Sequence, residues 1–169
     1  MTSTAAPSFP PANSTQIGTD KPGWAAELAA ANINPRTGLA TDYLNHFNEA
    51  IMLLEMIPDM PDCADDFLSW QPLSYQEHFT ASNFKARDLA IAAYDLTDPN
   101  IRTEFDNLTT TMTSILTAVA EAMREARQDK TRAALATQAT GWVKPLVMLA
   151  GGIINGQGGE ADVDYIMNH

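Results

Sequence analysis

The sequence predicts an all-α protein, a four-helix bundle with coiled-coil-like packing. Four segments repeat apolar residues at alternating intervals of four and three, and the breaks between them hold capping residues and prolines. A spacing that averages about 3.5 residues keeps one apolar stripe on one side of a helix, and such stripes pack at about 20° to each other. Strand-like alternation with turn dipeptides is lacking, so little or no sheet is expected.

The four apolar stripes fall within about 115 residues, a density typical of a helical bundle. The stripes are Tyr43, Phe47, Ala50, Leu54 and Ile57; Tyr75, Phe79, Ser82, Ala86, Leu89, Ala93 and Leu96; Ile101, Phe105, Leu108, Met112, Ile115, Val119 and Ala122; and Leu135, Ala139, Trp142, Leu146, Leu149 and Ile153.

The first two helices have clear start signals. Thr41 or Asp42 can cap the first helix, and Pro58 stops it. Ser74 can cap the second, which its stripe predicts as one helix over residues 75–96. The linker at residues 58–72 carries aromatic side chains and is predicted to form a helical turn on the bundle. It is also long enough to cross the bundle, so the direction of the second helix stays open.

The last two helices are marked just as clearly. Asp98 and Pro99 supply a cap and a first-turn proline for the third helix. A very short turn at Asp129 predicts that the third and fourth helices are antiparallel neighbours. Pro145 is expected to kink the fourth helix, and the pair at residues 155–156 suits its end.

Composition divides the chain into three regions. Residues 1–20 are Ser, Thr, Ala, Pro and Asn with few large apolar side chains, which predicts a disordered arm. Residues 21–155 form the predicted bundle domain, and it opens with a short helix that Gly23 can cap. Residues 156–169 are Gly-rich and then acidic, which predicts a flexible acidic tail.

The charge of the chain argues against several kinds of partner. With 21 acidic and 10 basic side chains its formal net charge is −11, which repels phosphate backbones and anionic membranes. We therefore expect neither a nucleic-acid nor a membrane partner, and the longest apolar stretch, residues 143–154, is too short to span a bilayer. Cys63 is the only cysteine and no secretory signal is visible, so a soluble cytoplasmic protein is expected.

Asp42, His46 and Glu49 form the candidate metal site of the sequence. They stand at i, i+4 and i+7, so they share one face of the first helix, and carboxylates and imidazoles are the ligands of metal sites in bundles. The inward row of that helix is apolar, however, and no Glu-x-x-His motif occurs on the other helices. A boundary histidine with two solvated carboxylates is the favoured interpretation, and no cofactor is expected.

A second histidine repeats the surroundings of the first. Residues 43–47 and 75–79 both read Tyr-x-x-His-Phe, which suggests either a duplicated helix with paired histidines or chance. The likeness fades beyond these residues, which favours chance. If the first two helices are antiparallel, His46 and His78 lie at opposite ends of the bundle and cannot share a ligand.

Two polar clusters leave alternatives open. Four threonines within residues 109–113 line a polar groove, mark a helix–helix contact or form a solvated face, and the solvated face is the favoured interpretation. Four basic side chains within residues 124–132 either compensate a helix carboxyl end or dock on an acidic partner. The acidic linker at residues 59–66 could pair with that basic cluster in self-association, which salt would weaken.

The sequence offers no catalytic set, since it lacks a nucleophile elbow and a phosphate loop. The favoured hypothesis is therefore a non-catalytic interaction protein that docks on a protein partner, in the simplest case as a homodimer. It predicts an exposed apolar patch near Trp70, Trp142 or the tail. The alternative is a bundle that binds a metal ion or an apolar small molecule, as an enzyme or not, with His46 or His78 at the mouth of a cavity.

Overall fold

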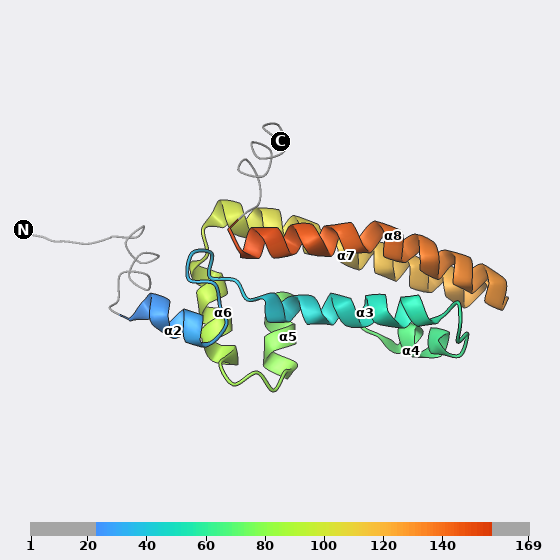
Figure 1. Cartoon of the computed structure of the whole chain (residues 1–169), viewed down its shortest axis with the longest axis horizontal. Coiled ribbons are helices and arrows are strands. Elements are labelled where there is room, and N and C mark those ends of the chain that lie inside the picture. The colour runs from blue at the N-terminus through green and yellow to red at the C-terminus, as the bar shows by residue number, and fades with distance from the viewer. Residues whose placement is uncertain (1–22, 157–169) are drawn as a thin grey trace, which may run out of the picture.

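The computed structural model describes residues 23–156, and within them the chain is all-α, as predicted. The predicted arm at residues 1–20 and all but the first residue of the predicted tail lie outside this range. Three long helices, α3 (Leu44–Met56), α7 (Pro99–Glu125) and α8 (Asp129–Ile154), run lengthwise, with shorter helices at both ends (Figure 1).

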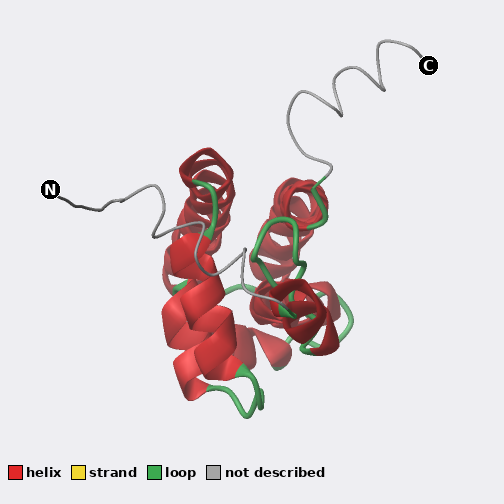
Figure 2. Ribbon diagram, turned by 90° about the vertical axis from the view of Figure 1, so that its left-hand side faces the viewer, coloured by secondary structure: helices red, strands yellow, loops and turns green. Residues whose placement is uncertain are grey.

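The long helices enclose the centre of the core. Figure 2 views them nearly end-on. Their fully buried side chains include Phe47 of α3, Phe105 and Met123 of α7, and Val143 of α8. Burial of apolar side chains of this size stabilises each by about 1.5–3 kcal/mol, so their packing drives the association of the helices. The predicted fourth stripe is only partly buried, because Trp142 and Leu149 are half-exposed and Val143 is buried instead. No helix within residues 23–156 combines the length and hydropathy needed to cross a membrane.

The α7–α8 hairpin confirms the predicted antiparallel neighbours. Pro99 opens α7, and the amide N–H of Asn100 donates to Asp98 Oδ1 at 2.8 Å, which satisfies an amide at the helix start. Only residues 126–128 separate the two helices. The end of α8 also agrees with the sequence, because Gly156 follows it with a φ of 78°, a value that suits glycine.

The segment predicted as the second helix is broken in two, so the expectation of one helix over residues 75–96 is wrong. The segment forms α5 (Tyr75–Ala81) and α6 (Arg87–Leu96). Between them the Ser82 hydroxyl donates to Phe79 O and accepts from the amide of Phe84, at 3.1 and 3.2 Å. A serine that bonds nearby backbone in this way competes with the helix. The break lets Phe84 pack edge-on against Phe79.

The start of α3 also differs from the prediction. A 3₁₀ turn, η2 (Thr41–Tyr43), leads into α3, and neither Thr41 nor Asp42 makes a side-chain capping bond there. The Asp42 carboxylate instead accepts a hydrogen bond from the side-chain amide Nδ2 of Asn45 at 3.3 Å and contacts the His78 ring. Both contacts draw the carboxylate away from the free amides at the helix start.

The linker after α3 forms a helical turn, as predicted, and then runs back along α3. Its helix α4 (Cys63–Ser69) buries Phe67 against the core. The chain then returns toward the amino end of α3, where the Tyr43 hydroxyl donates to Leu73 O at 2.6 Å. The direction left open by the sequence is thereby fixed, because α5 begins beside the start of α3.

A short amino-terminal helix, α2 (Trp24–Ala30), follows Gly23 as predicted and buries Leu28. The loop after it closes the far end of α8, since the Thr37 hydroxyl donates to Ile154 O at 2.6 Å. Gly38 approaches α6 closely with a φ of 76°, and a Cβ there would stand 2.9 Å from Ala93 O. Glycine is required at this contact both by space and by conformation.

Candidate functional site

His46 lies where α3, the returning linker and α5 meet, and it is buried with 7% of its surface exposed. Its ring Nε2 accepts from the amide N–H of Leu73 at 2.9 Å, and its own carbonyl accepts from the indole N–H of Trp70 at 3.1 Å. The two rings stack with centroids 4.5 Å apart. His46 therefore attaches the linker to α3 through three contacts.

The environment of His46 favours its neutral form. Burial and, as a smaller cause, the nearby His78 together lower the pKa of the imidazole to about 4. Because Nε2 accepts a hydrogen bond, the proton of the neutral ring is assigned to Nδ1. At neutral pH His46 is an uncharged side chain with its Nε2 lone pair already used.

The structure brings the two histidines together, so the arrangement that would separate them, with the first two helices antiparallel, does not apply. Their ring centroids are 6.2 Å apart. His78 Nε2 lies 3.0 Å from Asp42 Oδ2, so a carboxylate of the first helical segment pairs with the histidine of α5. The physical reason is the returning linker, which starts α5 beside the amino end of α3 rather than at its carboxyl end.

The predicted trio of Asp42, His46 and Glu49 does not converge on one point. Asp42 contacts His78, His46 is turned to Leu73, and Glu49 is exposed. Among residues 23–156 no group of three or more His, Cys, Asp or Glu side chains is placed to hold a metal ion. The metal site stays a prediction of the sequence that this arrangement does not favour.

A surface pocket opens beside the two histidines, with a volume of about 590 Å³. We call it the histidine pocket. Its size is within the range of about 300–1,000 Å³ that is usual for small-molecule sites. Its lining consists of Asn45, His46, Asn48, Glu49, Met52, Leu73, His78, Ala81 and Ser82.

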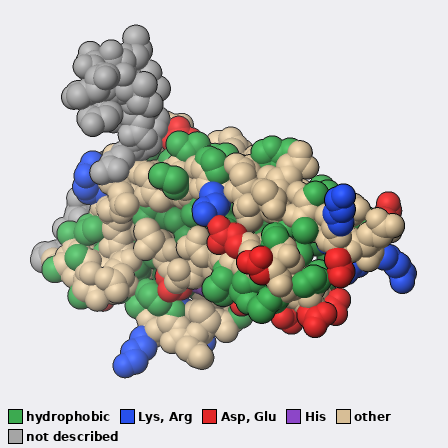
Figure 3. Space-filling model, turned by 45° about the vertical axis from the view of Figure 1, so that its right-hand side comes forward, with side chains coloured by type: hydrophobic (Ala, Val, Ile, Leu, Met, Phe, Trp, Pro, Cys, Tyr) green, Lys and Arg blue, Asp and Glu red, His purple; other side chains and the backbone are tan. Residues whose placement is uncertain are grey.

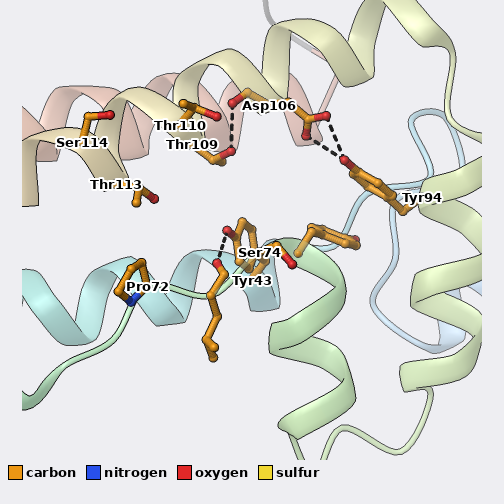
Figure 4. A pocket seen from close by; sticks show the side chains of 11 residues that line it. Tyr43, Pro72, Ser74, Tyr94, Asp106, Thr109, Thr110, Thr113 and Ser114 are labelled. Atoms are coloured by element: carbon orange, nitrogen blue, oxygen red, sulfur yellow. Dashed lines mark hydrogen bonds between the residues drawn. The ribbon is translucent and has the colours of Figure 1, made fainter. Parts of the chain in front are cut away.

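A second pocket, of about 440 Å³, lies between α7 and the start of α5 (Figure 4). We call it the hydroxyl groove, because most of its side chains carry hydroxyl groups. Three of the four threonines noted in the sequence line it, so the groove interpretation is the one the structure supports for them. The groove is lined by Tyr43, Pro72, Leu73, Ser74, Tyr75, Tyr94, Asp106, Thr109, Thr110, Thr113 and Ser114.

Tyr94 and Asp106 define one end of the hydroxyl groove. The Tyr94 hydroxyl lies 2.8 Å from each carboxylate oxygen of Asp106 (Figure 4). Burial raises the pKa of the Tyr94 phenol, and its hydrogen bond to Asp106 raises it further. The pKa of the Tyr43 phenol is also raised, mainly by burial and secondly by the negative charge of Asp106. Sequence reasoning missed this pair, because the two residues stand on different helices with no local motif.

The third feature is an exposed apolar surface on α8, near the Trp142 named in the sequence analysis. Trp142 is 51% exposed, Met148 77% and Leu149 51%. They share one side of α8 with smaller exposed residues, opposite the side that packs on α3 and α7. We define the outer face of α8 as Ala134, Gln138, Gly141, Trp142, Pro145, Met148 and Leu149. By contrast, Trp70 is half-buried against His46.

The charged clusters lie together at one end of the molecule, where α4 meets the α7–α8 turn (Figure 3). Arg132 Nε donates to the carbonyls of Met123 and Ala126 at 3.0 and 2.9 Å, which compensates the carboxyl end of α7. Arg124 donates to Leu68 O at 3.1 Å and holds α4 in place. Two of the four basic side chains therefore serve the fold.

Comparison with known proteins returns no match: no family model, no curated protein and no solved structure matches this chain.

Proposed function

We propose that this chain is a non-catalytic docking protein with bundle-like helical packing, and that it docks on a second copy of itself through the outer face of α8. The observation that supports this most is the exposure of Trp142, Met148 and Leu149 on one side of a helix whose other side is buried. Large apolar side chains grouped on one face are typical of protein interaction sites.

Charge favours a second copy as the partner. Two molecules of net charge −11 repel each other, so they associate best through a surface without carboxylates. After Asp129 the helix α8 carries no acidic residue. Its Lys144 is already paired with Glu55 of α3 at 2.8 Å. The outer face itself is uncharged, so no like charges face each other where two copies of it meet.

The shape of the outer face also suits a self-complementary contact. In a two-fold dimer the same surface is used on both subunits. A Cβ at Gly141 would have no atom within 4 Å, so the backbone is open to a neighbouring side chain there. In an antiparallel pairing centred near this residue, Trp142 of one copy covers Gly141 of the other. Contacts between large and small residues of this kind allow close packing of helices.

The oligomeric state tests this proposal, with analytical ultracentrifugation over a range of protein concentrations as the measurement. The expected result is a monomer–dimer equilibrium that Met148→Glu weakens by about 10-fold or more, because it buries a charge in the interface. Met60→Glu is the matched control, since Met60 is 49% exposed but stands on the linker before α4. A wild-type protein that stays monomeric throughout contradicts the proposal, as does equal weakening by both substitutions.

A second candidate function is ligand binding at the histidine pocket, either of an apolar small molecule or of a metal ion, with or without catalysis. The observation that favours it is the lining itself, where Met52 offers an apolar side chain beside His46 and His78. Native mass spectrometry of protein purified without chelator or affinity metal tests it. A bound mass that is lost in His78→Ala supports this function, and a bare chain mass or its multiple contradicts it.

A further inference from the structure

We propose that the hydroxyl groove binds a small organic ammonium ion, with Asp106 as its anionic partner. The inference goes beyond self-association, because the groove lies between α7 and α5 and shares no residue with the outer face of α8. It depends on three properties of the groove: its hydrogen-bonding character, its charge and its size.

Around Asp106, three hydroxyl groups of the groove already donate their protons within the protein. The Tyr43 hydroxyl donates to Leu73 O, and the Thr109 hydroxyl donates to Asp106 O at 3.1 Å. The Tyr94 hydroxyl donates to the Asp106 carboxylate (Figure 4). Each of these hydroxyl oxygens keeps its lone pairs for a ligand. The end of the groove at Asp106 therefore offers mainly acceptors, and a primary ammonium group, with three donors and no acceptor, complements them.

The charge of the groove has the same preference. Asp106 is the only charged side chain in its lining. The raised pKa of Tyr94 keeps that phenol neutral, so the groove carries a single negative charge. Within residues 23–156 no Lys, Arg or His nitrogen lies within ion-pair distance of Asp106, and the contacts of that kind are His78–Asp42 and Lys144–Glu55. A half-buried carboxylate with no cation beside it is a favourable partner for a cationic ligand.

Arg102 is the cation nearest to this end of the groove, and it is directed elsewhere. Its guanidinium lies 5.7 Å from the centroid of the Tyr94 ring. Its Nη1 donates to the carbonyls of Tyr94 and Asp95 at 3.4 and 3.2 Å. These contacts hold Arg102 on the carboxyl end of α6 and leave the carboxylate of Asp106 to the groove.

The size of the groove restricts the ligand to a small molecule. A volume of about 440 Å³ is near the lower end of the range of small-molecule sites. The side chains of Thr110, Thr113 and Ser114 continue along α7 from Asp106 (Figure 4). When the ammonium group of a ligand lies at Asp106, the rest of the ligand, a short carbon chain with polar substituents, lies along these hydroxyl groups.

Amide chemical shifts on titration with propylammonium chloride test the proposal, with 1-propanol and glycerol as neutral probes. Propylammonium is expected to shift the amide resonances of residues 106–114, whereas the neutral probes are expected to leave them unchanged. Asp106→Asn is expected to weaken this binding by about 10-fold or more, because it removes a charge-assisted hydrogen bond. The matched control is Glu104→Gln, which removes the same charge from an exposed position of α7 outside the groove and should change nothing.

A second variant keeps the test decisive if Asp106→Asn does not fold. Thr113→Val removes one hydroxyl acceptor from the groove at nearly constant volume, and it should weaken propylammonium binding several-fold. Equal binding to the wild type, to Asp106→Asn and to Thr113→Val overturns the proposal. Shifts of the same amides by glycerol and not by propylammonium also overturn it, since the groove is then a site for neutral polyols.

Discussion

At the scale of single residues, His46 shows how one side chain joins distant parts of the chain. Its ring accepts the Leu73 amide and stacks on Trp70, so it ties α3 to a linker that leaves the helix and returns. Part of this role was predictable: the sequence places His46 beside the apolar row of α3. The depth of its burial was not, because the indole that covers it comes from residue 70, beyond any local pattern.

The first prediction concerns the response of stability to pH. The folded pKa of His46 is lowered from 6.5 to about 4, so its contribution to stability is complete above pH 6.5 and is lost as the pH falls toward 4. The loss is at most about 3 kcal/mol. His46→Gln keeps an acceptor for the Leu73 amide without a titrating group, and the free energy of unfolding should then fall less between pH 7 and pH 4.5. Urea unfolding at both pH values measures this. An equal fall in the free energy of unfolding in the wild type and in His46→Gln contradicts the prediction.

A second prediction concerns Tyr94 and Asp106. Tyr94→Phe removes the only phenol that bonds the Asp106 carboxylate within residues 23–156, and we expect a loss of about 1–2 kcal/mol in the free energy of unfolding. Chemical denaturation measures the loss. Tyr43→Phe is a comparison at the other tyrosine of the groove, where the acceptor is the neutral carbonyl of Leu73, so its cost should be smaller.

At the scale of elements, the start signals were the most informative part of the sequence. Ser74 and Glu77 form a capping box at the start of α5, with bonds of 3.1 and 2.8 Å. Ser74→Ala is expected to lower the free energy of unfolding by about 1 kcal/mol. Ser69→Ala, which removes a bond to a carbonyl within α4, is the control and should cost less. A larger effect at Ser69 in thermal melts would show that the capping box contributes little.

The break between α5 and α6 shows where periodicity fails as a signal. The second stripe runs unbroken through Ser82 and Ala86, but small and polar residues hold these two positions. They add little burial to a continuous helix, whereas a break lets Phe84 pack on Phe79. The tertiary contact outweighs the local pattern. The third and fourth stripes keep large apolar residues at most positions, and there the prediction of two antiparallel helices is confirmed.

At the scale of the whole molecule, the excess of acidic side chains opposes compact folding. Within residues 23–156 the single lysine–carboxylate pair, Lys144–Glu55, offsets little of it. We therefore expect the melting temperature to rise as salt is increased from about 10 to about 150 mM, because screening over roughly 8–10 Å reduces the repulsion. Differential scanning calorimetry measures this. A melting temperature that falls with salt would mean that attractive pairs outweigh the repulsion.

The overall class of the fold followed from the sequence, but the arrangement around the histidine pocket did not. That arrangement depends on the path of residues 70–74, which have no periodic pattern and are held by contacts to Tyr43 and His46. The hydroxyl groove was visible only as four threonines, since its carboxylate and its tyrosines come from four separate elements. Sequence patterns report on the face of a single helix, and both pockets are formed between helices.

The contact between Thr37 and the carbonyl of Ile154 has a consequence for synthesis of the chain. It joins residues that are 117 positions apart. At a translation rate of about 5–20 residues per second, the loop that holds Thr37 is made roughly 6–23 s before the helix end that completes it. During that interval the apolar side of α3 has no α8 to cover it. In the nascent chain this apolar surface therefore stays uncovered until α8 has been translated.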